Sequence, residues 1–252
     1  MMQLVLLGSG NVATHLYKAF SASKKVQVKQ VYNHTRNNLD RFDTEVTTEL
    51  SALADADVYL LALKDDVIPQ IAETLSSKNA LIAHTSGSAG LDALEKCERK
   101  GVFYPLQTFS KDKRLDYSEI PFCLEANSPE DLSLLKDMAA EVSGKFYEIS
   151  SEQRKKIHLS AVFVCNFVNH LYSIGENICK ENDIPFEILQ PLIMETARKI
   201  RDASPSEVQT GPAIRNDQST IQAHLEQLTD PQNKEIYQLL TQAIQSFHGK
   251  KL

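Results

Sequence analysis

The ten residues Leu4–Ala13 constrain the fold more than any other stretch of this chain. They begin with four consecutive apolar residues, which suit a strand buried on both faces of a parallel sheet. The run breaks at Gly8-Ser9-Gly10, and apolar residues then recur at helical spacing. A strand, a glycine turn and a helix N-terminus are the order that a dinucleotide site requires. Gly8 allows the tight turn, Gly10 lets the backbone approach a pyrophosphate, and Ala13 lets the helix pack closely on the strand.

The unpaired amides and the positive dipole end of the helix would face the phosphates. The alternative is an ordinary strand-to-helix turn that needs glycine only for its dihedral angles. The strand before the turn and the helix after it favour a nucleotide site. Its predicted members are Gly8, Ser9, Gly10, Asn11, Val12 and Ala13.

The residues about twenty positions past the glycines indicate which dinucleotide binds. A second strand is expected at Val26–Tyr32, and Asn33, Thr35 and Arg36 follow it. An acidic residue here would bind the ribose of NAD, whereas an arginine suits the 2′-phosphate of NADP. Asn33 is neutral, Thr35 offers a hydroxyl, and Arg36 offers a planar fork. We predict NADP; the alternative is a solvated loop with one surface arginine.

Further apolar runs continue the sheet to about residue 150. The predicted fold is α/β: a Rossmann-type, doubly wound parallel sheet in residues 1–150, followed by an all-α domain in residues 151–252. The expected strands are Asp57–Leu63, Ala80–Ala83, Gly101–Tyr104, Pro121–Ala126 and Lys145–Ile149, with helices over 67–75 and between the last two strands.

Ligands of such sheets lie beyond the carboxyl ends of the strands. We therefore expect Leu63, Lys64 and Ser86 to border the cofactor, with Asp65 and the rest of the turn after the fourth strand on the floor of the cleft. Ser86 is expected to shape the pocket, because no base adjoins it in the sequence. His84 is interpreted as a structural histidine rather than a proton carrier.

From Ser151 onward every segment has helical periodicity. Ser150 or Ser151 can cap a long helix that reaches Glu181. The middle of this helix is apolar almost all round, which predicts burial in a bundle or an interface. At about 100° per residue, His158 and Asn166 share one face. They line the cofactor cleft or only bond neighbouring helices.

A polar turn, Thr210–Asp217, separates the later helices. Its Gly-Pro step beside Arg215 suits an anchor for a carboxylate or phosphate, although a plain loop is the alternative. Asp217 or Ser219 can cap the next helix, which carries His224.

Composition excludes several classes of protein. The net charge of −6 argues against a general nucleic-acid binder. No apolar segment is expected to reach the length of a membrane span. The four cysteines show no metal-binding spacing, so no metal is expected, and reduced thiols in the cytoplasm are favoured.

Together these features resemble a bacterial family of Rossmann-like proteins whose C-terminal domain has no assigned function. That family is related to pyrroline-5-carboxylate reductases, deazaflavin-dependent NADP reductases and the 6-phosphogluconate dehydrogenase superfamily. The resemblance covers nearly the whole chain. Its motifs are residues 8–13, 61–66, 84–87 and 104–109, His158 with Asn166, and residues 210–212 with Arg215, Asp217 and His224.

The resemblance implies a nicotinamide-binding domain, a helical domain like the C-terminal domain of 6-phosphogluconate dehydrogenase, and a homodimer formed through that domain. The related β-hydroxyacid dehydrogenases use a lysine and an asparagine on the first long helix after the sheet. Asn166 matches the asparagine, but no lysine lies one turn before it. This departure speaks against simple 3-hydroxyacid chemistry.

The sequence thus predicts an NADP-dependent oxidoreductase that acts on a small, anionic metabolite. His158 is the expected proton carrier because imidazole titrates near neutral pH. Asn166 would orient the substrate and Arg215 would hold its negative group. The alternative is a non-catalytic NADP-binding regulatory protein or sensor.

Overall fold

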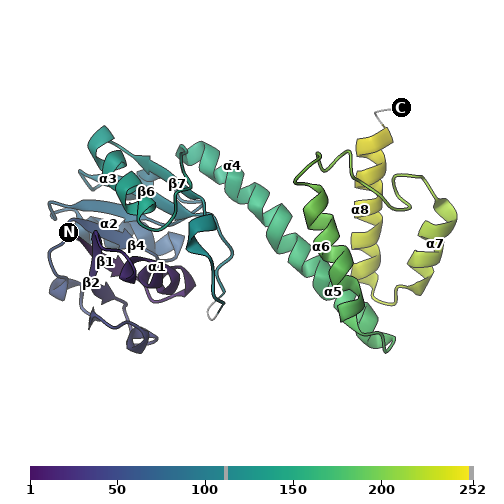
Figure 1. Ribbon diagram of the computed structural model, residues 1–252, viewed down its shortest axis with the longest axis horizontal. Helices are drawn as coiled ribbons and strands as arrows, with labels where there is room; N and C mark the ends of the chain where they lie inside the picture. The colour runs from purple at the N-terminus through teal and green to yellow at the C-terminus, as the bar shows by residue number, and fades with distance from the viewer. Residues whose placement is uncertain (111–112, 250–252) are drawn as a thin grey trace. The chain divides into compact units, whose positions relative to one another are not determined.

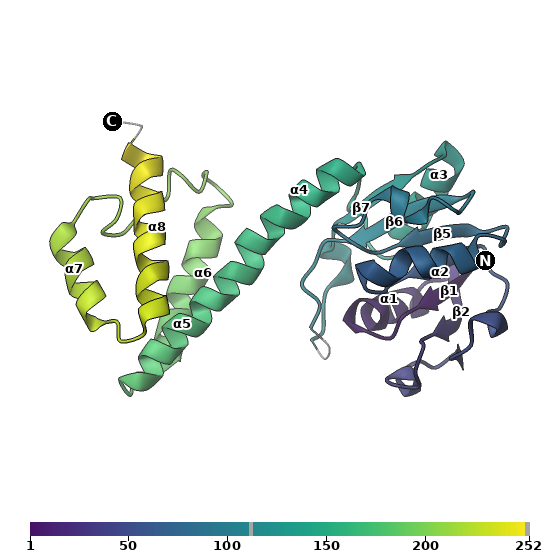
Figure 2. The same ribbon diagram turned by 180° about the vertical axis from the view of Figure 1, so that it is seen from behind.

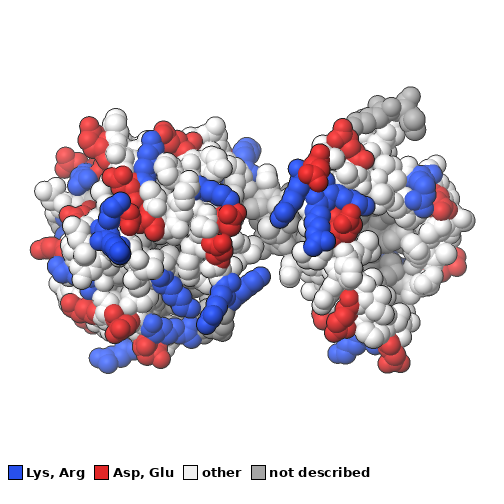
Figure 3. Space-filling model, in the orientation of Figure 1, with Lys and Arg blue, Asp and Glu red and all other residues white. Residues whose placement is uncertain are grey.

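The computed structural model describes residues 1–110 and 113–249. The chain forms two compact units, Met1–Asn166 and Phe167–Leu252. The eight-stranded sheet of the first unit ends at Glu148, close to the predicted limit of 150. Acidic and basic side chains are interspersed on the faces that Figure 3 presents, in keeping with the modest net charge of −6.

The strand order of the sheet is β3-β2-β1-β4-β5-β6-β7-β8. All neighbouring strands are parallel except β6 and β7, which are antiparallel. From β1 the chain adds β2 and β3 on one side and then β4 and the later strands on the other side. Rossmann folds bind dinucleotides at this switch point between β1 and β4. The strands are β1 (Met2–Leu7), β2 (Val26–Tyr32), β3 (Glu45–Thr47), β4 (Val58–Leu61), β5 (Leu81–His84), β6 (Lys100–Pro105), β7 (Phe122–Ala126) and β8 (Phe146–Glu148).

The four-residue apolar run is buried as predicted, because helices cover both faces of the sheet (Figures 1 and 2). Leu4 and Leu6 pack in the core with α1 (Asn11–Ser21) and α3 (Pro129–Ala140). Val5 and Leu7 point to the other face, in the core with α2 (Ile68–Leu75). Alternate residues of one strand thus serve two cores, so the whole run is apolar.

Sequence patterns predicted every strand of the sheet except β3, and they missed the 3-10 turns. β3 has three residues and is mostly exposed, so it has no apolar period to recognise. The other short elements are 3-10 turns: η1 (Leu39–Arg41), η2 (Leu50–Ala52), η3 (Asp65–Val67), η4 (Leu91–Leu94) and η5 (Tyr117–Glu119).

The chain after the sheet is helical, as predicted. A capping box starts the long helix: Ser150 Oγ accepts from the Gln153 amide at 3.3 Å, and Gln153 Oε1 accepts from the Ser150 amide at 3.0 Å. The helical elements are α4 (Ser151–Ala161), the π-helical η6 (Val162–Phe167), α5 (Val168–Glu181), η7 (Phe186–Leu189), α6 (Gln190–Lys199), α7 (Gln218–Gln227) and α8 (Pro231–Gly249).

Two expectations for this long helix need correction: that regular α-helical spacing runs from His158 to Asn166, and that no apolar segment is long enough to span a membrane. Its π-helical stretch winds more slowly than an α-helix, so regular α-helical spacing does not hold through it. The helix Ser151–Glu181 is also long and apolar enough, by length and composition, to cross a membrane. Scattered polar side chains had made this length hard to see in the sequence. No residue of the most apolar stretch of this helix is buried within the chain.

Candidate functional site

The glycine turn has the geometry that a dinucleotide requires. Gly8 has a φ of 122°, and a Cβ there would lie 2.2 Å from the carbonyl oxygen of Ala62, so only glycine fits. A Cβ on Gly10 would meet no atom within 4 Å. No side chain caps α1, which starts at Asn11. The free helix terminus and the open space at Gly10 together fit a pyrophosphate.

The strand ends place further backbone at the same edge of the sheet. Leu7 is in register with Leu61, and Leu61 with His84, so the turns after β1, β4 and β5 begin side by side. Among the remaining predicted cofactor residues, Ala13 is fully buried, and Val12 and Leu63 are half-buried against the two cores.

The predicted ribose-end residues divide into loop-forming and exposed groups. Asn33 Nδ2 donates to the carbonyl oxygen of Thr35 at 2.9 Å and to its hydroxyl at 3.1 Å. Ser9 Oγ donates to the carbonyl of Asn37 at 3.0 Å, which ties the glycine turn to this loop. Arg36 is exposed and borders a hollow of about 800 Å³. The position of Arg36 leaves its guanidinium accessible to a phosphate.

The turns after β4 and β5 are bonded to each other. Ser86 Oγ accepts from the amides of Ser88 and Ala89 at 3.1 and 2.9 Å, so it closes its own turn. Ser88 Oγ donates to Asp65 at 2.5 Å. Lys64 is exposed at the start of η3. These contacts show that Ser86 holds its own turn, and its role beside the cofactor stays a prediction.

His84 is a structural histidine. Its Nε2 lies 3.1 Å from the carbonyl of Gly90, and its Nδ1 accepts from the amide of Ser86 at 3.2 Å. Burial lowers the pKa of His84 to about 4, so the ring is neutral near pH 7. Both nitrogens are used, which confirms the interpretation made from the sequence.

A second cavity, of about 600 Å³, brings His158 and Asn166 together within the first unit. His158 Nδ1 lies 3.1 Å from the hydroxyl of Tyr104, at the carboxyl end of β6. Burial raises the pKa of Tyr104 to about 12. The lining residues are Tyr104, Leu106, Gln107, Thr108, Phe109, Ile157, His158, Ser160, Ala161, Val162, Val164, Cys165 and Asn166.

A buried arginine fixes α4 against the sheet. Arg154 is 0% exposed, and its guanidinium donates to Glu125 Oε2 at 2.6 Å and to the carbonyl of Ala89 at 2.5 Å. Ser151 Oγ donates to the same carboxylate at 2.7 Å and accepts from the Leu91 amide at 2.9 Å. Because Arg154 precedes His158 by one helical turn, this anchor sets where the imidazole lies.

The cavity loop is held by the cofactor helix. Asn11 Nδ2 donates to the carbonyl of Phe109 at 3.0 Å, so the glycine motif contacts the cavity lining directly. The buried ring of His15 lies 2.8 Å from the carbonyl of Ser110 and 3.0 Å from the hydroxyl of Tyr117. The cofactor turn and the second cavity are therefore parts of one bonded assembly.

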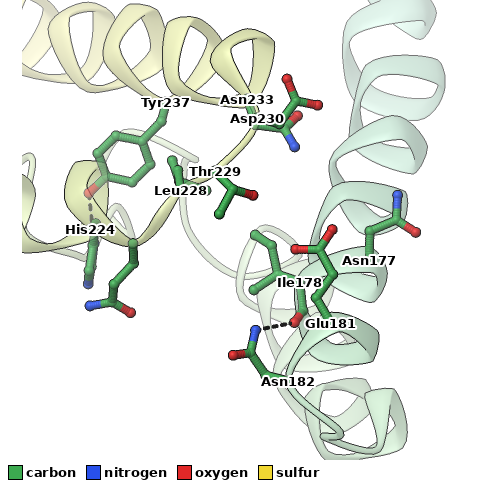
Figure 4. Close-up of a pocket in the computed structure, with 11 residues that line it drawn as sticks. Asn177, Ile178, Glu181, Asn182, His224, Leu228, Thr229, Asp230, Asn233 and Tyr237 are labelled. Carbon is green, nitrogen blue, oxygen red and sulfur yellow. Dashed lines mark hydrogen bonds between the residues drawn. The ribbon is translucent and has the colours of Figure 1, made fainter.

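The other predicted residues lie in the second unit. Arg215 is exposed in the turn before α7, and Asp217 caps that helix by accepting from the Thr220 amide at 3.1 Å. His224 Nδ1 lies 2.8 Å from the Tyr237 hydroxyl (Figure 4). His224 borders a pocket of about 460 Å³, which has the carboxylates Glu181 and Asp230 and no lysine or arginine in its lining. This pocket does not suit an anion.

Sequence reasoning did not assign Tyr104 or Arg154 to the site. Tyr104 closed a predicted strand at the edge where ligands bind, which was a usable signal. Arg154 stood in a basic run, Arg154-Lys155-Lys156, and nothing in that run distinguishes the buried member from the exposed ones.

Comparisons with known proteins identify the family. Residues 3–86 match the family model "NADP oxidoreductase coenzyme F420-dependent", and residues 120–244 match a domain of unknown function, DUF2520. A crystal structure from Bacteroides fragilis, provisionally described as an NADP oxidoreductase, is 40% identical over 97% of this chain and 98% of its own, with a TM-score of 0.90. The chain belongs to this family of NADP oxidoreductases.

More distant structures share the fold. A protein from Thermotoga maritima is 21% identical, with a TM-score of 0.72 over 98% of this chain and 99% of its own. A pyrroline carboxylate reductase from Plasmodium falciparum, solved with NADP bound, is 14% identical, with a TM-score of 0.60 over 97% and 98%. A search of curated proteins finds no match. The predicted fold, cofactor and oxidoreductase class are confirmed.

Proposed function

We propose that this NADP-dependent oxidoreductase acts on a small, anionic metabolite bound in the cavity that His158 and Asn166 line. The observation that carries the proposal is the bonded link between two sites. Asn11 of the glycine motif holds the Phe109 carbonyl, and Phe109 lines the same cavity as His158. Because this hydrogen bond joins two distant parts of the chain, the local stability of α1 does not explain it.

The cofactor would lie along the carboxyl edge of the sheet. Residues Gly8–Ala13 would hold the pyrophosphate, and Leu63, Lys64 and Ser86 would border the path beyond it. Arg36 would bind the 2′-phosphate, with Asn33 and Thr35 shaping the loop around it. The bound nicotinamide supplies hydride chemistry, so the protein must bind and orient the substrate and manage one proton.

His158 would carry that proton, and Asn166 would orient the substrate through its amide. Arg215, which is expected from the sequence to hold the negative group, lies in the second unit, and that role stays a prediction. His158 is half-buried and Asn166 is exposed, so both are open to a small molecule. An imidazole beside the reacting group serves general acid–base chemistry near neutral pH.

We further propose that residues 1–150 bind the cofactor and that residues 151–252 form the substrate and dimerisation domain. The helical part exposes many large apolar side chains, and a contiguous surface of this kind commonly marks a protein interface. They include Phe163, Val164, Phe167, Ile188, Leu192, Met194 and Ile200. A second copy would cover them and form a homodimer, and light scattering that reports a monomer at micromolar concentration would contradict this.

We also expect the protein to lie in the cytoplasm, since all four cysteines are free.

The function is tested by NADPH oxidation against a panel of small oxo acids and cyclic imino acids. His158→Ala should lower turnover by roughly 10²–10⁴-fold at unchanged NADPH affinity. His170→Ala, which replaces an exposed histidine of the same long helix, is the control. NADPH binding without turnover of any substrate would favour the sensor alternative, and undiminished turnover would remove His158 from the chemistry.

A further inference from the structure

Tyr104 and His158 form a packed pair beside the cavity. The hydroxyl of Tyr104 lies 3.1 Å from His158 Nδ1, and the two rings meet edge to face at 6.1 Å between centroids. The backbone of Gly87 lies against both. A Cβ there would be 2.6 Å from His158 Nδ1 and 2.8 Å from Tyr104 Cζ. The Nδ1 side of the imidazole is therefore enclosed.

The partners of the Tyr104 hydroxyl indicate which of the two groups donates in the hydrogen bond between Tyr104 and His158. Within residues 1–110 and 113–249, Nδ1 of His158 is the only hydrogen-bond partner of the Tyr104 hydroxyl. If Nδ1 carried the proton, the phenol hydrogen would lack a protein acceptor in this part of the chain, and a half-buried hydroxyl that leaves a hydrogen bond unmade loses stability. Burial raises the pKa of Tyr104 to about 12, so the phenol keeps its proton at neutral pH. The phenol therefore donates to Nδ1.

A neutral imidazole that accepts at Nδ1 carries its proton on Nε2. Nε2 has no protein partner within the described ranges, and His158 lines the cavity. The nitrogen left for a ligand is thus an N–H donor. Such a donor matches a carbonyl oxygen, which accepts hydrogen bonds, and opposes a protonated imine, whose nitrogen is itself a donor.

We propose that Tyr104 is a positioning residue that holds His158 in its Nε2–H tautomer, which fits the cavity to the carbonyl oxygen of a small oxo acid. When the carbonyl is reduced, Nε2 would give its proton to the oxygen while Nδ1 takes the phenol proton of Tyr104, so the imidazole stays neutral. The substrate class rests on the proposed function of this cavity. The tautomer does not, because it is a property of the protein without substrate.

The tautomer is measured by ¹⁵N NMR on protein with selectively labelled histidines. His158→Ala identifies the His158 signal among the seven histidines. The wild-type protein should show a protonated Nε2 and an unprotonated Nδ1. Tyr104→Phe should move His158 toward a mixture of tautomers, as should Gly87→Ala, which crowds the pair without removing either ring. Tyr147→Phe, an exposed tyrosine of β8, should change nothing.

Kinetics test the substrate class. The wild-type protein should favour oxo acids over cyclic imino acids in kcat/KM with NADPH. Tyr104→Phe should lower kcat for the oxo acid about tenfold, the usual effect of losing one hydrogen bond, while the KM for NADPH stays unchanged. Tyr147→Phe is again the control, and unfolding temperatures check that each variant is folded.

The outcomes separate the two proposals. A protonated Nδ1 in the wild-type protein, or the same tautomer in Tyr104→Phe, overturns the role of Tyr104. Preferred turnover of imino acids overturns the substrate class. If no substrate is turned over while the NMR result stands, the proposed function and the substrate class are rejected and the tautomer assignment is supported.

Discussion

Replacing Arg154 with methionine would remove the cation that holds α4 on the sheet. The guanidinium is fully buried, and it donates to Glu125 at 2.6 Å, to the Ala89 carbonyl at 2.5 Å and to Ser151 Oγ at 3.2 Å. Methionine fills much of the volume with apolar atoms. It leaves the carboxylate of Glu125, whose side chain is 19% exposed, without its cation.

Breaking a buried ion pair by removing one partner costs about 3–5 kcal/mol. The low end applies here, because Nε of Arg154 is buried without a hydrogen-bond partner in the described part of the chain and already carries a desolvation cost. With ~2–4 °C per kcal/mol in a chain of this length, a loss of about 3 kcal/mol lowers the Tm by about 6–12 °C.

Thermal unfolding of the full chain, followed by circular dichroism, measures the effect. Lys155→Met is the matched control, because Lys155 pairs with Glu152 at 3.0 Å on the surface and such pairs contribute below about 1 kcal/mol. The double variant Arg154→Met/Glu125→Met should regain part of the loss, since both charges are then absent. Equal unfolding temperatures for Arg154→Met and Lys155→Met would refute the anchoring role.

Three further perturbations follow from the site. Arg36→Ala should remove most of the preference for NADPH over NADH, about ten- to a hundredfold for a charge-assisted phosphate contact; equal affinities in the unmutated protein, by fluorescence titration, would contradict it. Gly10→Val should abolish NADPH binding, because the side chain would fill the space of the pyrophosphate, and it should leave the Tm unchanged, because a Cβ there meets no atom within 4 Å. Gly8→Ala should instead lower the Tm, because its Cβ would lie 2.2 Å from the Ala62 oxygen. Since the buried ring of His84 has a pKa of about 4 against 6.5 when exposed, the unfolded chain takes up a proton first on acidification. Stability should fall between those pH values by up to about 3 kcal/mol, and His84→Gln should flatten this slope in urea titrations at several pH values.

The sequence by itself determined the sheet, the cofactor turn and the helical second half. These features depend on local rules, and each leaves a pattern in consecutive residues. Leu4–Leu7 had to be apolar because a parallel strand packs on both faces, and Gly8 had to be glycine because its backbone is left-handed. Caps at Ser150 or Ser151 and at Asp217 or Ser219 were predicted for the same reason: a helix end needs partners within three residues. The structure uses Ser150 and Asp217.

Only the tertiary structure decided which side chains meet. Tyr104 and His158 are 54 positions apart, and Arg154 reaches Ala89 across 65. No periodicity within either segment encodes such contacts, because they arise when a strand end and a helix pack together. The π-helical stretch in the long helix also escaped the sequence, since it changes helical spacing without a characteristic residue. The sequence had already indicated His158 as the proton carrier and His84 as a structural histidine, but only the fold shows their partners, which are Tyr104 for His158 and the backbone of Ser86 and Gly90 for His84.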